Sequence, residues 1–236
     1  MRYTKKHYDY NLVIKLGIMM LAALLLVGLN EAKGQQFIVD DAAVTTERSF
    51  QLETWYGEFE SEFIPAVAVT SWLEAGVALA FDTKDNFSLA GYALEAKAVT
   101  GDFEELGRAF GLFAGFGFND SSEFEEFVTY VPYSQLFMNG SSALHLNLGL
   151  AFADNGEEWE SSIIYGARAD WGVHERFTIL TEVFAENDDF GFQAGGRFGL
   201  IPGLLEMDIM YGRGFEDGFD FPGFTVGVAF TPDSLW

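Results

Sequence analysis

Large apolar side chains alternate with small or polar side chains along most of the chain after residue 48. In the stretch "SALHLNLGLAFAD", residues 142–154, leucine recurs at every second position from Leu144 to Leu150, with His145 and Asn147 in between. Successive side chains of a β-strand point to opposite faces, so this spacing predicts a strand with one apolar face and one polar face.

The same alternation predicts an all-β chain of twelve strands, each followed by a turn. The predicted strands cover residues 49–58, 63–70, 73–82, 86–99, 108–118, 126–137, 142–153, 160–171, 176–186, 189–200, 204–213 and 222–231. Helical spacing is limited to one short candidate, "FEELGRAF" at 103–110. No linker or composition break follows residue 48, so residues 49–236 are predicted to form a single β domain.

The connections between the predicted strands fall into two alternating sets. Counted from the first, every second connection is acidic: "GEFESE", "TKDN", "NDSSEFEE", "DNGEEWE", "ENDD" and "FEDGFD". The connections between them are mostly neutral or apolar, with "TGDFEELG" as the exception. A barrel with an even number of strands has two ends that can differ in this way, whereas a simple sandwich predicts no such alternation.

Composition indicates which face of the strands meets lipid. The chain has 25 Phe and 26 Gly, and the charged residues of the predicted strands have Gly and Ala beside them. Small neighbours suit a narrow interior, and the bulky apolar side chains then face lipid. We therefore predict a closed antiparallel transmembrane β-barrel of about 12 strands with short acidic outer loops. A soluble lipocalin-like barrel or sandwich is the alternative.

The first 48 residues begin with the sequence features of a secretory signal peptide. Basic residues between Arg2 and Lys15 precede an apolar run from Leu16 to Leu29, and small residues follow it. This pattern predicts a secretory signal peptide over residues 1–34, with an uncleaved anchor as the alternative. Residues 35–48 are then a periplasmic N-terminal segment. We expect the chain to be integral to the outer membrane of a Gram-negative bacterium.

The net charge limits the partners. The chain carries a formal net charge of −23 at pH 7 and has no cysteine. Such a charge does not suit nucleic acid, and a disulfide framework is excluded. The expected partners are outer-membrane lipid, lipopolysaccharide, small solutes and diffusely bound divalent cations; the oligomeric state stays open. The loops "DTKDN" (82–86) and "EDGFD" (216–220) lack the full spacing of a calcium loop, so we predict no discrete metal site and no cofactor.

Three stretches resemble a known family. They are "VTYVPYSQLFMNGSSALHLNLGLAF" (128–152), "YGARADWGVHERFTILTEVFAEN" (165–187) and "FQAGGRFGLIPGLLEMDIMYGRGF" (192–215), and "IPAVAVTSWLEAGVALAFD" (64–82) is a looser match. Together they resemble the outer-membrane barrels of the meta-pathway phenol-degradation family. That resemblance implies a barrel fold and a role in the transport of small solutes.

Charged and polar residues on the predicted inner faces form the candidate site. They are predicted to line a pore: Glu53, Glu74, Glu95, Lys97, His145, Asn147, Arg168, Asp170, Glu182, Arg197, Glu206 and Asp208. Four neighbouring strands bring Arg168, Glu182, Arg197 and the Glu206/Asp208 pair side by side, where opposite charges stabilise each other. The same set of residues permits a charged constriction or a closed plug of ion pairs.

Two functions follow from these alternatives. The first is a narrow channel or transporter for small solutes with a charged lumen, in which the excess of acidic groups favours cations or neutral solutes. The second is a closed structural or surface-display barrel. A third, an outer-membrane lipid-modifying enzyme, is disfavoured because Ser161 and Ser162 are predicted at the outer rim, away from His145 and His174. We predict no enzymatic activity and no catalytic residue.

Glycine leaves parts of the inner wall bare. Gly111, Gly115 and Gly117 follow Ala109 on one predicted strand, and Gly227 occupies a similar position on the last strand. Residues 35–48, or one of the turns at the inner end of the barrel, could fold into this space, but relief of curvature in a small barrel is the favoured explanation.

Overall fold

The structure is a computed structural model that describes residues 37–58, 60–83, 87–101, 103–215 and 222–235. The predicted signal peptide lies outside the described residues. So do residues 84–86 of the first acidic loop considered for calcium and residues 216–220 of the second.

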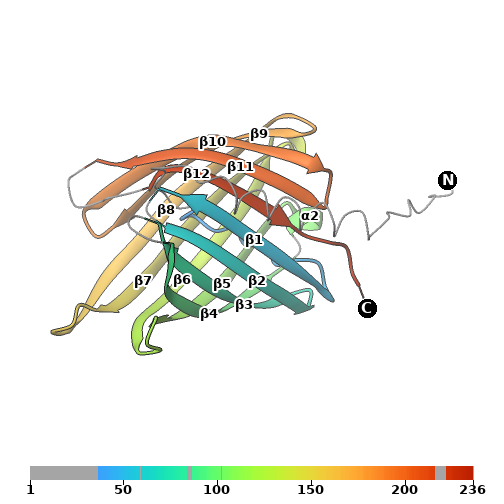
Figure 1. Cartoon of the computed structure of the whole chain (residues 1–236). Helices are drawn as coiled ribbons and strands as arrows, with labels where there is room; N and C mark the ends of the chain where they lie inside the picture. The colour runs from blue at the N-terminus through green and yellow to red at the C-terminus, as the bar shows by residue number, and fades with distance from the viewer. Residues whose placement is uncertain (1–36, 59, 84–86, 102, 216–221, 236) are drawn as a thin grey trace, which may run out of the picture. The chain divides into compact units, whose positions relative to one another are not determined.

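Within the described residues, twelve antiparallel strands close into a barrel (Figure 1). The strands are β1 (Ser49–Gly57), β2 (Glu60–Thr70), β3 (Leu73–Asp82), β4 (Ser88–Thr100), β5 (Arg108–Asn119), β6 (Phe124–Phe137), β7 (Ser142–Asp154), β8 (Trp159–His174), β9 (Phe177–Glu186), β10 (Asp189–Ile201), β11 (Leu205–Gly214) and β12 (Pro222–Phe230). The shortest have 9 residues, about the length that a tilted strand needs to cross a bilayer. The predicted fold class is confirmed.

Each strand pairs with the next one in sequence, and β12 closes the ring on β1. In this closing pair Leu52 lies opposite Phe230, and Gly57 lies opposite Thr225. The observed strands start and stop within three residues of the predicted ones. The largest differences are the start of β2, where the polar residues Ser61 and Glu62 pair with both β1 and β3, and the end of β8, which continues to pair with β9 as far as His174.

The barrel has two distinct ends. We call the end with the six connections β1–β2, β3–β4, β5–β6, β7–β8, β9–β10 and β11–β12 the loop end, and the opposite end the terminal end. At the terminal end Leu235 donates its N–H to the carbonyl of Arg48 at 3.0 Å, and the Ser49 hydroxyl donates to the carbonyl of Pro232 at 2.7 Å. The chain therefore enters and leaves the barrel wall at the same end.

Two short helical turns lie between strands at the terminal end. They are α2 (Phe103–Leu106), inside the predicted helical candidate, and the 3-10 turn η1 (Met138–Gly140). Among the described residues, no helix has both the length and the apolar character needed to cross a membrane.

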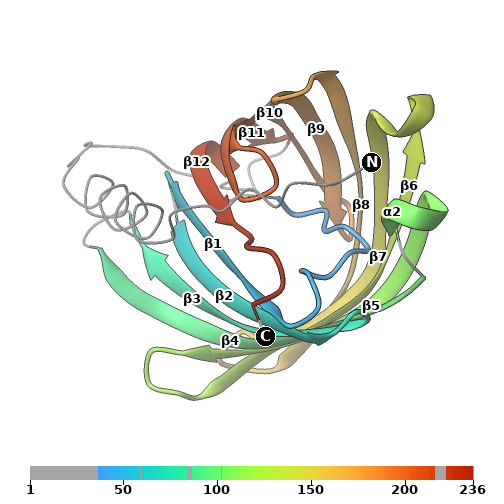
Figure 2. The ribbon, with the colours of Figure 1, turned by 90° about the vertical axis from the view of Figure 1, so that its right-hand side faces the viewer.

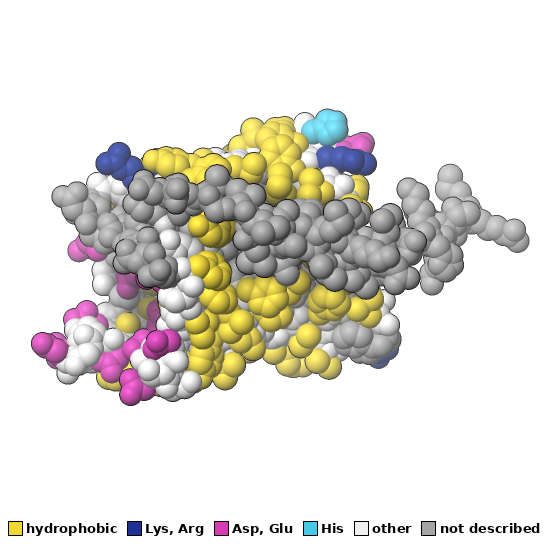
Figure 3. All heavy atoms as spheres, in the orientation of Figure 1, with side chains coloured by type: hydrophobic (Ala, Val, Ile, Leu, Met, Phe, Trp, Pro, Cys, Tyr) yellow, Lys and Arg dark blue, Asp and Glu magenta, His cyan; other side chains and the backbone are white. Residues whose placement is uncertain are grey.

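Side chains alternate between the interior and the outer surface. On the inner face of β7, His145 and Asn147 are 3% and 9% exposed. On the outer face of the same strand, Leu148 is 63% exposed. Figure 3 shows hydrophobic side chains over the middle of the visible wall and acidic side chains gathered at the loop end. The leucine face of β7 thus meets the surroundings of the barrel, and its polar face meets the interior.

Candidate functional site in the barrel interior

Residues 37–46 run through the interior of the barrel, and we call them the strap (Figure 2). Val39 and Ala42 in the strap are each only 1% exposed. The sequence predicts a periplasmic segment over residues 35–48, and in the structure residues 37–46 of this segment lie inside the barrel. The strap lies in the interior because inward side chains of six strands provide partners for the backbone and the charges of the strap.

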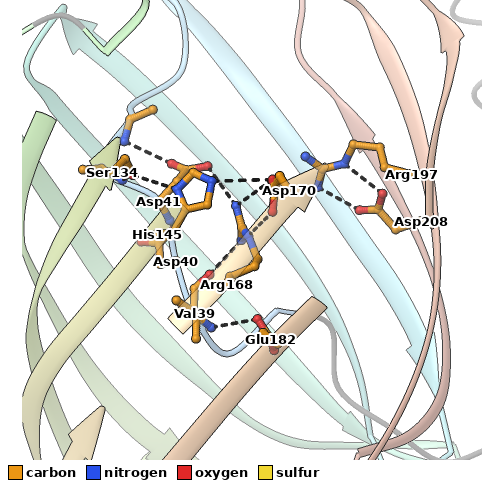
Figure 4. Close-up of polar contacts among 12 residues, drawn as sticks. Val39, Asp40, Asp41, Ser134, His145, Arg168, Asp170, Glu182, Arg197 and Asp208 are labelled. Carbon is orange, nitrogen blue, oxygen red and sulfur yellow. Dashed lines mark hydrogen bonds and ion pairs between the residues drawn. The ribbon is translucent and has the colours of Figure 1, made fainter. Parts of the chain in front are cut away.

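The first part of the strap is bound by β8 and β9. The Glu182 carboxylate accepts the N–H groups of Ile38 at 3.0 Å and Val39 at 3.3 Å (Figure 4). Arg168 donates from Nη1 to the carbonyl of Val39 at 2.7 Å. Gln193 of β10 donates to Glu182. Two neighbouring strands therefore satisfy both the N–H and the C=O groups of this backbone, as buried peptide groups require.

The middle of the strap is bound through its two aspartates. Lys97 of β4 lies 3.1 Å from a carboxylate oxygen of Asp40, and the Tyr130 hydroxyl donates to the same carboxylate at 3.1 Å. The side-chain amide of Asn147 pairs with the backbone of Asp40: its oxygen accepts the Asp40 N–H, and its NH₂ group donates to the Asp40 carbonyl. Asp41 lies 3.7 Å from Arg168 and 3.8 Å from Lys97.

The ionisation of Asp41 follows from these neighbours. Burial alone would raise the pKa of Asp41, but the positive charges of Lys97 and Arg168 outweigh burial and hold that pKa below its usual value. The carboxylate therefore stays charged at neutral pH, and protonation occurs only at a lower pH than for a free aspartate.

The last part of the strap is bound by β6 and β3. The N–H of Ala42 donates to the Ser134 hydroxyl at 2.7 Å, and Ser134 lies 2.8 Å from Nδ1 of His145. Farther along, the N–H of Thr45 donates to the Glu74 carboxylate at 2.7 Å. The serine that contacts His145 is therefore the fully buried Ser134. Ser162 lies at the loop end, where its hydroxyl donates a hydrogen bond to Glu186.

A second charged cluster lies next to the start of the strap. Arg197 makes two bonds to Asp208, at 2.8 and 2.9 Å, and lies 3.3 Å from Glu206. The Phe37 ring lies under two guanidinium groups, with its centroid 4.6 Å from Arg168 and 5.1 Å from Arg197. Such cation–π contacts are attractive and add to the docking of the strap.

The twelve residues predicted to line a pore are all placed towards the interior. Eight line a cavity in the barrel interior: Glu53, Glu74, Glu95, Lys97, Asn147, Arg168, Arg197 and Glu206. Four lie in the polar network beside the strap: His145, Asp170, Glu182 and Asp208. Their role in lining a pore stays a prediction.

The predicted row of cross-strand charge pairs is present in part. Arg197 and Asp208 lie opposite each other and form the expected ion pair. Arg168 and Glu182 also lie opposite each other, but Arg168 bonds to Asp170 at 2.9 Å, and Glu182 accepts bonds from the strap. The prediction missed the partners of Glu182 because the strap was not expected in the interior, and it paired Arg168 across strands although Asp170 lies two residues away on the same face.

A cavity of about 750 Å³ remains beside the strap. Its lining includes Glu62, Glu126 and Glu186 near the loop end, and Glu206 and Thr231 near the terminal end. Strap residues from Phe37 to Thr46 form part of the same lining. The cavity thus extends past the strap towards both ends of the barrel.

The wall formed by β3, β4 and β5 makes room for this cavity. Gly76, Ala93, Gly115 and Gly117 line it, and Glu95 projects between them. A Cβ atom added at Gly115 or Gly117 would first meet side chains of the barrel wall, whereas one added at Gly166 on β8 would lie 2.5 Å from Val39 of the strap. The strap therefore packs against Gly166, and not in the place that the glycine-rich strand suggests.

Sequence reasoning missed several residues of this site. Phe37, Asp40 and Asp41 lie in a segment without strand periodicity, and Ser134 is a common small polar residue inside a strand. The one available signal was the hypothesis that residues 35–48 fold inward, which the favoured explanation by curvature set aside. Among the described residues, no group of three or more His, Asp or Glu side chains is arranged to hold a metal.

Residues 21–228 match the model of a family described as "Uncharacterised conserved protein UCP029691". The chain belongs to this family. No curated protein matches it.

Three solved structures similar to this chain are two porins and an outer membrane channel. The KdgM porin in complex with disordered oligogalacturonate has a TM-score of 0.61 at 9% identity, over 78% of this chain and 99% of that one. The NanC porin gives 0.53 at 11%, over 78% and 100%. The COG4313 outer membrane channel from Pseudomonas putida F1 gives 0.56 at 8%, over 83% and 98%. At these identities the likeness concerns the fold, which is that of outer-membrane channels.

Proposed function

We propose that the protein is a narrow channel for small solutes in the outer membrane of a Gram-negative bacterium, with a preference for cations. The cavity that passes the strap towards both ends of the barrel carries this proposal. The porin-like fold supports it. The resemblance to the meta-pathway phenol-degradation family adds the expectation of a small solute without identifying it.

The preference for cations comes from the charges around the cavity. Among the described residues that line it, nine carry carboxylates and three carry positive charges. The positive charges already have acidic partners: Lys97 faces Asp40, Arg168 faces Asp170 and Asp41, and Arg197 faces Asp208. The surplus carboxylates, such as Glu53 and Glu95, leave the cavity with a negative potential that attracts cations.

A closed structural barrel is the second candidate. The strap favours it, because a docked segment with buried charges narrows the interior and makes the wall rigid. The two candidates differ in one observable, which is whether ions cross a membrane through the folded protein.

Single-channel recording of the wild-type protein, produced with its own leader and purified from membranes, tests the proposal. We expect small discrete conductance steps and a reversal potential that indicates cation preference in a salt gradient. Replacing both Glu53→Gln and Glu95→Gln removes two lining carboxylates, so the preference for cations should weaken. The matched control is Glu157→Gln with Glu158→Gln, which removes two exposed carboxylates from the β7–β8 loop.

The outcomes separate the two candidates. A folded, inserted wild-type protein that gives no steps supports the closed barrel and contradicts the channel. Steps whose selectivity responds to the loop control as strongly as to the cavity variant would place the filter outside the interior, and the proposed role of the lumen would then be wrong.

A further inference from the structure

The strap is anchored on opposite sides of the barrel. Glu182 on β9 accepts the N–H groups of Ile38 and Val39, and Glu74 on β3 accepts the N–H of Thr45. In the closed ring of twelve strands, β3 and β9 are six strands apart. A segment held at two opposite points cannot swing out of the interior unless both anchors break.

The anchoring groups are charged and buried. Glu182, Arg168 and Glu74 are 3%, 4% and 9% exposed. If the strap left, the Glu182 carboxylate would lose two N–H donors and Arg168 would lose the Val39 carbonyl. Because hydrogen bonds to a charged group are about twice as strong as those between neutral groups, these contacts favour the docked position.

The strap also presents charge to the cavity that passes it. The Asp41 side chain is 37% exposed, more than that of Asp40, and its contacts with Arg168 at 3.7 Å and Lys97 at 3.8 Å are longer than the 3.1 Å contact between Asp40 and Lys97. Asp41 lines the cavity and lies within electrostatic range of Glu53 on β1. A cation that moves along the cavity therefore meets a carboxylate from the strap as well as carboxylates from the wall.

We infer that the strap is a fixed selectivity element: it stays docked while a solute passes, and Asp41 is its selectivity-determining charge. This inference rests on the proposed channel function. It assigns part of the filter to a segment outside the barrel wall, and it excludes a mechanism in which the strap must leave before ions flow.

A reversible tether tests whether the strap stays docked. The chain has no cysteine, so the pair Val39→Cys and Gly166→Cys introduces the only two thiols. A Cβ at residue 166 would lie 2.5 Å from Cγ2 of Val39, a position that the sulfur of a cysteine at residue 39 can take. We expect the oxidised and reduced forms of this variant to have the same conductance and the same reversal potential.

A second tether covers the case in which the first variant does not fold. Ala42→Cys and Ser134→Cys join the strap to β6, where the Ala42 nitrogen and the Ser134 oxygen are 2.7 Å apart. For either pair, conductance that falls on oxidation and returns on reduction would show that the strap moves out to open the channel, and would overturn the inference.

The charge of the strap is tested separately with Asp41→Asn. We expect the cation-to-anion permeability ratio to fall by about threefold, the size of effect that one partly screened unit charge produces nearby. Glu157→Gln serves as the control and should leave the ratio unchanged. An unchanged ratio in Asp41→Asn would refute the role of Asp41.

These results can be separated from a failure of the proposed function. If the wild-type protein gives no conductance steps, the channel itself is excluded. If the wild type conducts but the tether or Asp41→Asn gives the opposite result, the channel stands and only the fixed strap is wrong.

Discussion

The wall formed by β7, β8 and β9 and the wall formed by β3, β4 and β5 show the same alternation but hold different contents. The first carries large buried polar groups on its inner face, His145, Arg168 and Glu182, and the strap lies against it. The second carries small residues such as Gly76 and Gly115 and borders the cavity. Both walls line the cavity, but the first holds the strap in close contact, whereas the second reaches it through the long side chains of Glu74 and Lys97 and is otherwise lined by small residues.

The difference between the two walls shows that the alternation of apolar and polar residues predicts which side chains point inward. It does not predict what those side chains contact. Inside a barrel both polar and small residues are compatible with a narrow interior, so hydropathy does not distinguish the two walls. Size and hydrogen-bonding capacity do. Long charged side chains reach the strap and satisfy its backbone, whereas glycine and alanine leave room beside it.

The largest expected effect is the loss of a central group on the wall that holds the strap in close contact. Arg168→Ala removes the partner of Asp170, Asp41 and the Val39 carbonyl at once. Breaking a buried charge pair from one side costs about 3–5 kcal/mol, so the free energy of unfolding should fall by that order. Urea unfolding in lipid vesicles measures it.

The control for this variant is Arg213→Ala, because Arg213 on β11 is exposed. Its free energy of unfolding should change by no more than about 0.5 kcal/mol. Equal losses in both variants would mean that the Arg168 contacts with the strap contribute nothing specific.

A smaller effect is expected from crowding that same wall against the strap. In Gly166→Ala the new Cβ would lie 2.5 Å from Val39 and 3.0 Å from the carbonyl oxygen of Val183. Overpacking of this kind costs about 1–3 kcal/mol. Val39→Ala removes the methyl group in the way, so the double variant should lose less stability than the sum of the two single variants. A strictly additive cycle would contradict the contact between strap and wall.

The smallest effect is expected from the same substitution on the wall formed by β3, β4 and β5. In Gly115→Ala the nearest atom, 3.1 Å away, is at the outer edge of the Phe113 ring, which can shift into the cavity. The free energy of unfolding should stay within about 0.5 kcal/mol of the wild type. A loss as large as that of Gly166→Ala, measured under the same conditions, would remove the distinction between the two walls.

The strands were predictable because their signal is local. Residues 73–82 are predicted as a strand, and β3 has those same bounds. Predictions failed by a few residues where polar residues continue a strand, as at the start of β2, because pairing with neighbours decides the end of a strand. The inward placement of Arg168 and Glu182 was also predictable, because every second side chain of a strand points to the same face.

The partners of those side chains were less predictable. Parity and strand order bring Arg197 and Asp208 together, and the ion pair between them forms. The partner of Glu182 is the backbone of Ile38 and Val39, which lies 144 and 143 residues away in sequence. No periodicity within residues 37–46 indicates that contact.

The sequence by itself determined the alternation, the number of strands and the inward side of the strands on which residues such as Arg168 and Glu182 lie, because each depends on neighbours along the chain. The tertiary structure alone decided that the strap occupies the interior and that Arg168, Glu182 and Glu74 hold it. Those groups come from strands far apart in sequence and meet only when the barrel closes. The strap has no regular secondary structure, so its docking depends on charges and hydrogen-bonding groups that come close to one another only in the folded barrel.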